Sequence, residues 1–214
     1  MMTNQWRRIT YTLWAPGYDF VAWIFHRKRS RAITLLALQP QERVLIVGAG
    51  TGLDLPLLCP GLQLTAVDLT PAMIRRLTKR AARLELPIDA RVMDAHELEF
   101  ADGSFDAVIL HLILAVVPDP VKCIREVERV LRPGGRVVVL DKFVPEGHSP
   151  SLVRRIFNPL ARFFFTDMTR QLGTILQSAP ALRVTHDEPA GLGGFFRIAL
   201  LQKRSEEHGQ ASSP

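Results

Sequence analysis

The sequence is poor in residues on which several protein classes depend. Only two of its 214 residues are cysteines, Cys59 and Cys123, which are too few for a disulfide framework, and neither lies in a metal-ligand spacing. We therefore expect a reducing compartment and no metal. No apolar run is long enough to span a bilayer, because the longest, at 107–117, is short and contains His111.

A secretory leader is also missing from the start of the sequence, where Arg7 and Arg8 are followed by mixed polar and aromatic residues. The expected location is the cytoplasm. Hydrophobic residues make up 47% of the chain and charged residues 22%, as in one globular domain with a sizeable core. The net charge of +6 suits nucleic acid or anionic lipid, but a basic protein can also lack both partners.

From Arg43 onward, short apolar runs alternate with amphipathic segments, which predicts βαβ units and a parallel sheet. A helical region at 6–38 precedes this alternation. Strands are expected at 44–47, 64–67, 88–93, 105–114, 136–141, 182–186 and 195–202. Helices are expected at 53–58, 71–84, 120–131 and 167–178.

The strongest local signal is a buried strand that runs straight into a glycine loop, with the sequence VLIVGAGTG at 44–52. Gly48, Gly50 and Gly52 let the backbone turn sharply and let a ligand approach the main chain. A dinucleotide fingerprint has the spacing G-x-G-x-x-G, whereas here the third glycine comes one residue early. The spacing argues against NAD and favours a ligand without a pyrophosphate.

Asp68 ends the second strand, about 20 residues beyond the glycine loop, where an acidic side chain can accept both hydroxyls of a ribose. An aspartate here could instead cap the helix that begins near Pro71. Thr70 is the more natural cap, and that choice would leave Asp68 available for a ligand.

Over roughly residues 43–143, the sequence resembles the class I S-adenosylmethionine (SAM)-dependent methyltransferases. Besides the glycine loop and Asp68, three motifs occur in the family's order: DA at 94–95, SFD at 104–106 and LRPGG at 131–135. The resemblance implies SAM as cofactor. It also implies a Rossmann-like α/β fold, with a mostly parallel seven-stranded sheet, a C-terminal antiparallel strand pair and helices on both faces.

The resemblance also assigns cofactor contacts. The three glycines would wrap the methionine part of SAM, and Asp68 would bind the ribose. Leu69 and Met73 would lie against the adenine, while Asp94, followed by Ala95, would accept from the adenine amino group. Many relatives carry an acidic residue two places before the first glycine, where this sequence has Ile46, which leaves the geometry around the methionine amino group open.

SAM supplies the reactivity, so the protein must align the acceptor, exclude water and hold an amine acceptor unprotonated. No Ser/His/Asp or Cys/His constellation for covalent catalysis stands out. His111, at the end of the fourth strand, would face the methyl-transfer side and is a candidate general base. Alternatively, its backbone contacts SAM and its ring lines the pocket.

The run WAPGYD at 14–19 is similar to that of small bacterial phosphatidylethanolamine N-methyltransferases, and its Tyr-Asp pair also occurs in quinone C-methyltransferases. The resemblance implies that Tyr18 contacts the cofactor and that Tyr11 lines the acceptor site. Either ring can also stabilise an ammonium group by cation–π attraction, so both are candidate catalytic residues. Alternatively, these aromatics pack the N-terminal helix onto the sheet.

The segment LVRRIFNPLARFFF at 152–165 suits a membrane surface, because apolar residues recur at helical spacing beside arginines that can meet phosphates. The alternative is a lid over the acceptor pocket. We expect an N-terminal helical cap at 1–42 and a SAM-binding core at 43–204. That core includes a lid or membrane-facing insertion at 145–180, and a disordered tail follows at 205–214.

The expected activity is SAM-dependent N-methylation of a lipid amine, namely phosphatidylethanolamine and its methylated products, at an anionic membrane surface. A quinone or other small-molecule methyltransferase would keep the fold and cofactor. No nucleic-acid partner is expected, because HLIL at 111–114 replaces the Asn/Asp-Pro-Pro-aromatic motif of enzymes that methylate base amino groups. An inactive SAM-binding module is the third alternative, and the intact glycine loop and Asp68 argue against it.

Overall fold

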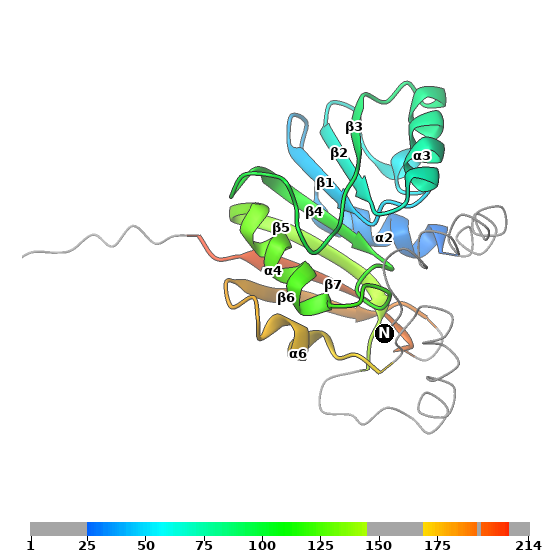
Figure 1. Ribbon diagram of the computed structural model, residues 1–214. Coiled ribbons are helices and arrows are strands. Elements are labelled where there is room, and N and C mark those ends of the chain that lie inside the picture. Colours follow the sequence, from blue (N-terminus) through cyan, green and yellow to red (C-terminus); the bar gives the residue numbers. More distant parts are fainter. Residues whose placement is uncertain (1–24, 145–168, 192–193, 206–214) are drawn as a thin grey trace, which may run out of the picture.

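Seven strands form one sheet in the order β3-β2-β1-β4-β5-β7-β6 within the described residues, which are 25–144, 169–191 and 194–205 of this computed structural model (Figure 1). The strands are β1 (Arg43–Val47), β2 (Gln63–Asp68), β3 (Ile88–Val92), β4 (Phe105–His111), β5 (Leu131–Lys142), β6 (Leu182–Pro189) and β7 (Phe196–Lys203). Strands β1 to β5 pair in parallel, whereas β7 is antiparallel to both β5 and β6. The predicted Rossmann-like sheet is confirmed.

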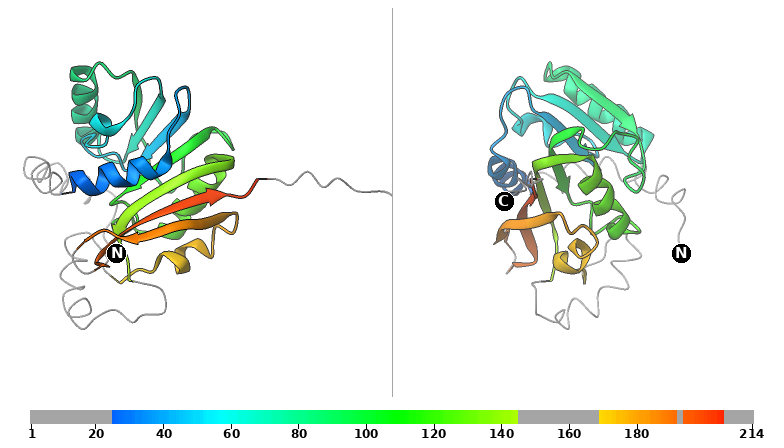
Figure 2. Two further views of the ribbon diagram at one scale, coloured as in Figure 1. Left: turned by 180° about the vertical axis from the view of Figure 1, so that it is seen from behind. Right: turned by 90° about the vertical axis from the view of Figure 1, so that its left-hand side faces the viewer.

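Helices cover both faces of this sheet (Figures 1 and 2). One face carries α2 (His26–Leu36), the 3-10 helix η1 (Leu55–Leu57) and α3 (Pro71–Arg83), and the other carries α4 (Pro120–Val130) and α6 (Leu172–Leu176). Each α-helix buries an apolar stripe; in α4 the stripe is Cys123, Ile124, Val127 and Val130. The faces that lack this stripe are polar and meet solvent.

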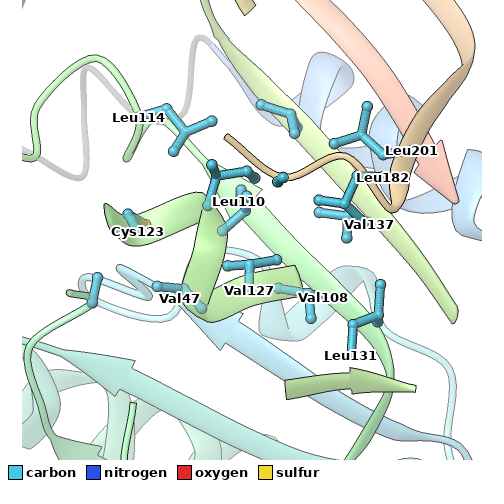
Figure 3. Close-up of a cluster of buried hydrophobic side chains, with 14 of the residues drawn as sticks. Val47, Val108, Leu110, Leu114, Cys123, Val127, Leu131, Val137, Leu182 and Leu201 are labelled. Carbon is cyan, nitrogen blue, oxygen red and sulfur yellow. The ribbon is translucent and has the colours of Figure 1, made fainter. Parts of the chain in front are cut away.

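The central strands are apolar because their side chains feed two separate cores. Successive residues of a strand point to opposite faces, so β4 contributes Val108 and Leu110 to the core beneath α4 but Ala107 and Ile109 to the core beneath α2. Figure 3 shows the core beneath α4, where Val127 of the helix meets residues of the central strands.

Several boundaries differ from the prediction. β4 ends at His111 instead of reaching 114, because Leu112 has a φ of +60° and turns the chain out of the sheet. β5 begins at Leu131 instead of at 136, since Leu131 of the LRPGG segment already pairs with Phe105 before a register shift. Within the described residues, the helix expected at 167–178 is confined to Leu172–Leu176, where Leu172 and Ile175 pack into the core.

The carboxyl ends of the parallel strands meet at one edge of the sheet. Chain order reverses between β1 and β4, and in open α/β sheets ligands bind at such a switch point. The predicted residues Tyr11 and Tyr18, and the segment 152–165, lie outside the described residues. None of the helices in the described ranges has the length and apolar character needed to cross a membrane.

Candidate cofactor and active site

A pocket opens at this carboxyl edge. Its wall is built from the loops that follow β1 to β4, and its described lining residues are Gly48, Gly50, Val67, Asp68, Leu69, Thr70, Met73, Met93, Asp94, Ala95, His96, Leu112, Ile113, Val116, Val117 and Pro118. Most of the predicted cofactor contacts therefore come together around one cavity. Gly52 and His111 are not among the described residues that line it.

The glycine loop has no room for side chains at two of its three glycines. Gly48 has a φ of +67°, and a Cβ placed on it would lie 2.2 Å from Cδ1 of Ile113. Gly52 has a φ of +78°, and a Cβ there would lie 3.0 Å from Cδ1 of Leu55. Glycine thus serves both the backbone conformation and the close packing of the loop against the segment after β4.

Asp68 holds the loops of β1 and β2 together. Its two carboxylate oxygens accept hydrogen bonds from the backbone N–H groups of Gly50, at 2.9 Å, and Thr70, at 2.8 Å. Burial raises the pKa of Asp68, and these hydrogen bonds partly offset that effect. The Thr70 side chain also hydrogen-bonds to the carboxylate. A carboxylate has about four acceptor sites, so it keeps capacity for a ligand hydroxyl.

This arrangement corrects the expectation that Thr70 caps the following helix and leaves Asp68 without local bonds. Thr70 occupies the N-cap position of α3, but its side chain makes no capping hydrogen bond. The Asp68 carboxylate accepts from the Thr70 N–H instead, two residues along the chain. Such a local turn is favourable because aspartate readily bonds to the backbone two residues ahead.

Asp94 is also engaged locally, by a residue that the sequence analysis did not select. Its Oδ1 lies 2.6 Å from Nδ1 of His96 and accepts the His96 backbone N–H at 3.0 Å. The other ring nitrogen, Nε2, accepts the backbone N–H of Asp119 at 3.3 Å. Since a carboxylate only accepts, the His96 ring carries its proton on Nδ1 and links the pocket to the start of α4.

The pocket fits SAM. Leu69, Met73 and Val117 offer apolar surface to an adenine ring, and Asp68 offers acceptors to ribose hydroxyls. Gly48 and Gly50 leave main-chain space for an extended ligand. The assignment of the adenine amino group to Asp94 stays a prediction.

His111 belongs to a buried polar cluster beside the pocket, which we call the Arg29–Asp54–His111 cluster. Nδ1 of His111 lies 2.8 Å from Oδ1 of Asp54, and Nη1 of Arg29 donates to both oxygens of Asp54, at 2.8 and 2.9 Å. The three side chains are 1%, 3% and 5% exposed for His111, Asp54 and Arg29. The cluster thus joins β4, the segment after the glycine loop and α2.

The charges in this cluster determine the ionisation of Asp54. Burial by itself would raise the pKa of Asp54, but the nearby charges and hydrogen bonds of His111 and Arg29 outweigh burial and hold the pKa well below its usual range. Asp54 is therefore an ionised carboxylate inside the protein. Nε2 of His111 is buried as well and has no hydrogen-bond partner among the described residues.

A second group of side chains lies at the same edge of the sheet, near the end of β5 and the start of β7. We call Phe25, Lys28, Lys142 and Phe196 the lysine–phenylalanine cluster. Lys142 of β5 pairs directly with Phe196 of β7. The Nζ atoms of Lys28 and Lys142 lie 5.0 and 5.9 Å from the Phe196 ring centroid, and Lys28 lies 4.7 Å from that of Phe25. Burial lowers the pKa of Lys142, partly offset by the charge of Asp141.

Asp141 fixes the loop that follows β4. This carboxylate is completely buried and accepts the backbone N–H groups of Ala115 and Lys142, at 2.9 and 2.8 Å. Burial raises the pKa of Asp141, and the charge of Lys142 together with these hydrogen bonds works against the rise. The loop carries Val116 and Val117 of the pocket wall, so Asp141 helps to fix the position of this part of the wall.

Comparison with known proteins agrees with this geometry. Residues 45–139 match the model of the family described as a methyltransferase domain. Over 169 residues the chain is 34% identical to phosphatidylethanolamine N-methyltransferase of Cereibacter sphaeroides, covering 76% of this chain and 80% of the relative. Over 152 residues it is also 34% identical to demethylmenaquinone methyltransferase of Thermus thermophilus, covering 67% and 69%.

A solved structure shows the same fold. Geranyl diphosphate C-methyltransferase from Streptomyces coelicolor, in complex with S-adenosyl-L-homocysteine, matches with a TM-score of 0.67 and 17% sequence identity. The match covers 83% of this chain and 80% of that chain.

Proposed function

Since the chain belongs to the class I SAM-dependent methyltransferases, we propose that it methylates the amine of a phospholipid headgroup, as in phosphatidylethanolamine and its methylated products. The lysine–phenylalanine cluster is the observation that carries this choice of acceptor. It lies at the ends of β5 and β7, across the switch point from the cofactor pocket. An acceptor bound there would adjoin the methyl group.

The cluster offers positive charge next to aromatic surface. Two ammonium groups beside one ring repel each other, and a shared anion would remove that cost. A phospholipid headgroup supplies a phosphate for the lysines and apolar glycerol and acyl groups for the rings of Phe25 and Phe196. A quinone ring carries no anionic group of that kind and would not engage the two ammonium groups.

The protein contributes binding and proton handling, while bound SAM supplies an activated methyl group on its sulfonium. Gly48, Gly50 and Asp68 would hold the cofactor. An ammonium group has no lone pair, so the acceptor must lose a proton before it can attack, and His111 is the described candidate for this role. Tyr11 and Tyr18 remain predicted catalytic residues outside the described part of the chain.

Peripheral attachment of a cytoplasmic protein to an anionic membrane is part of the proposal. A lipid amine lies at the bilayer surface, and the arginines and phenylalanines of the segment at 152–165 suit that surface. The relative named phosphatidylethanolamine N-methyltransferase supports a membrane location only because its named substrate is a membrane lipid.

Quinone C-methylation is the second candidate, because the demethylmenaquinone methyltransferase relative is equally identical in sequence. One experiment separates the two. Purified protein is incubated with methyl-labelled SAM and vesicles that contain either phosphatidylethanolamine or a demethylated quinone in neutral lipid. Label in the phospholipid supports the proposal, whereas label in the quinone alone rejects it.

A further inference from the structure

The Arg29–Asp54–His111 cluster contains two residues to which no function has been assigned so far, Arg29 and Asp54. Both charges are almost completely removed from water, and taking an ion pair out of water is costly. Such a pair is weak evidence for stability alone. Its position next to the glycine loop and the end of β4 points instead to a role in the active site.

The hydrogen bond between Asp54 and His111 determines which ring nitrogen carries the proton. The ionised carboxylate can only accept, so Nδ1 of His111, 2.8 Å away, must be the donor. In the neutral ring, the lone pair therefore belongs to Nε2. This atom points away from Asp54, is buried and has no partner among the described residues.

The backbone of His111 lies between the two halves of the site. His111 is the last residue of β4, and the next two residues, Leu112 and Ile113, line the cofactor pocket. On its other side β4 pairs with β5, where His111 is in register with Leu140, two residues before Lys142. This place in the sheet, between the cofactor pocket and the lysine–phenylalanine cluster, is what points to a role in proton transfer.

We propose that Asp54 is a positioning residue that holds His111 as a proton acceptor for the substrate ammonium, with Arg29 fixing Asp54 in turn. The inference rests on the proposed function, since it assumes an amine acceptor. In the step, an N–H bond of the ammonium breaks and a bond from the proton to Nε2 forms, while the electron pair stays on the substrate nitrogen. The proton passes to water after the product leaves.

Arg29 supplies the positive charge that balances the buried carboxylate of Asp54. The guanidinium and the carboxylate lie 2.8 Å apart, so the negative charge of Asp54 has a permanent counter-ion inside the protein. Arg29 also accounts for both oxygens of Asp54, which prevents the carboxylate from turning away from His111.

The test compares rate and pH dependence in Asp54→Asn and His111→Gln. Methyl transfer from SAM to phosphatidylethanolamine vesicles is measured from about pH 7 to about pH 10, near the value of roughly 10.4 for a lysine-like ammonium. At pH 7 we expect kcat to fall about 100-fold in both variants, with the dissociation constant for SAM unchanged. The deficit should shrink as pH rises, because the substrate itself then loses its proton.

A double variant tests whether Asp54 acts through His111. Asp54→Asn combined with His111→Gln should be no slower than His111→Gln alone. Multiplied losses, or a deficit that does not change with pH, would show that Asp54 has only a structural role and overturn the inference.

Two further variants guard against misfolding. Asp54→Asn leaves the buried guanidinium of Arg29 without its counter-ion. The double variant Arg29→Met with Asp54→Asn removes both charges together. It should show the same pH-dependent deficit in kcat. Asp106→Asn is the matched control, because Asp106 is also paired with two arginines, Arg43 and Arg132, but lies at the start of β4. It should keep wild-type kcat at every pH.

A measurement without any acceptor separates this inference from the proposed function. Nitrogen-15 NMR of the His111 ring, in protein with bound SAM, reports which nitrogen is protonated. Protonation of Nδ1 is the expected result, and protonation of Nε2 in the neutral ring overturns the inference. If phosphatidylethanolamine takes up no label, the acceptor assignment fails, and the NMR result still decides the state of His111.

Discussion

The carboxylate of Asp68 accepts a 2.9 Å hydrogen bond from the backbone N–H of Gly50, so the side chain predicted to bind the ribose also fixes the glycine loop. A change at Asp68 should therefore affect both the predicted ribose contact and the conformation of the glycine loop.

Replacing Asp68 with asparagine should weaken SAM binding. An amide has one oxygen where the carboxylate has two, so its NH₂ group must face the N–H of Gly50 or Thr70. Hydrogen bonds to charged groups are worth roughly 1.5–3 kcal/mol, so we expect the dissociation constant to rise about 10- to 100-fold. Titration calorimetry measures this dissociation constant for SAM. Asp89→Asn, at an exposed carboxylate on β3, is the control, and equal affinities in both variants would contradict the assignment.

Replacing Gly48 with alanine should destabilise the protein and impair cofactor binding. The new Cβ would meet Ile113, and the left-handed backbone costs an L-residue roughly 1–2 kcal/mol by itself. Gly61→Ala is a matched control, because Gly61 has a φ of +84° but its nearest contact would be 3.6 Å away. Urea unfolding should show a larger loss at Gly48. Adding Ile113→Ala should leave Gly48→Ala with a smaller extra loss than in the wild-type background.

Replacing Lys28 with methionine should weaken binding of the phospholipid acceptor. The side chain keeps its apolar stem against Phe25 and Phe196 but loses its charge. We expect the KM for phosphatidylethanolamine vesicles to rise about tenfold or less, since Lys28 is only partly buried and its charge is partly screened by water. The dissociation constant for SAM should not change. Lys79→Met, at an exposed lysine on α3, should leave both constants unaltered, and equal KM values for the two variants would argue against a phosphate site.

Acid should destabilise the wild-type protein partly through Asp54. Because the pKa of Asp54 is depressed in the folded state, its contribution is present above the unfolded value of about 3.9 and is lost as pH falls toward the folded value. Between about pH 6 and about pH 3, the wild type should lose on the order of 1 kcal/mol more than Arg29→Met with Asp54→Asn. Urea unfolding at both pH values provides the comparison. Parallel losses would mean that Asp54 is not held ionised by its partners.

Local patterns were enough to predict the fold and to select residues of which most lie around one pocket. A buried strand followed by closely spaced glycines, and an acid at the end of the next strand, are features of adjacent residues. The order of βαβ units then brings Gly48, Asp68 and Asp94 to one edge without further information. The prediction therefore succeeded wherever chain order alone determines which residues meet.

The Arg29–Asp54–His111 cluster could not be predicted in this way. Arg29 is one of several basic residues in α2, and nothing in the sequence indicates which of them points inward. Its partner lies 25 residues later, and their contact depends on how the helix lies across the sheet. Asp54 did leave a signal that we did not use, because it is an isolated charge between Leu53 and Leu55 directly after the glycine loop.

The lysine–phenylalanine cluster was missed for a related reason. Lys142 and Phe196 face each other only because β7 is inserted between β5 and β6 in antiparallel register. Sequence patterns predict that the last two strands pair, but they do not fix which residue of β5 lies opposite which residue of β7. Register across distant strands comes from tertiary packing.

The burial of Arg29 in α2 limits where this protein can be cut or recombined. A fragment that starts at β1 would keep the glycine loop and the DA, SFD and LRPGG motifs, yet it would leave the Asp54 carboxylate buried without the guanidinium of Arg29. Grafting a different leading helix onto the same sheet would fail for the same reason, unless it supplied a guanidinium at that point. In evolution and in chimera design, residues 25–36 and the glycine loop must therefore be inherited as one unit, although the alternating pattern of strands and helices begins only at Arg43, after that helix.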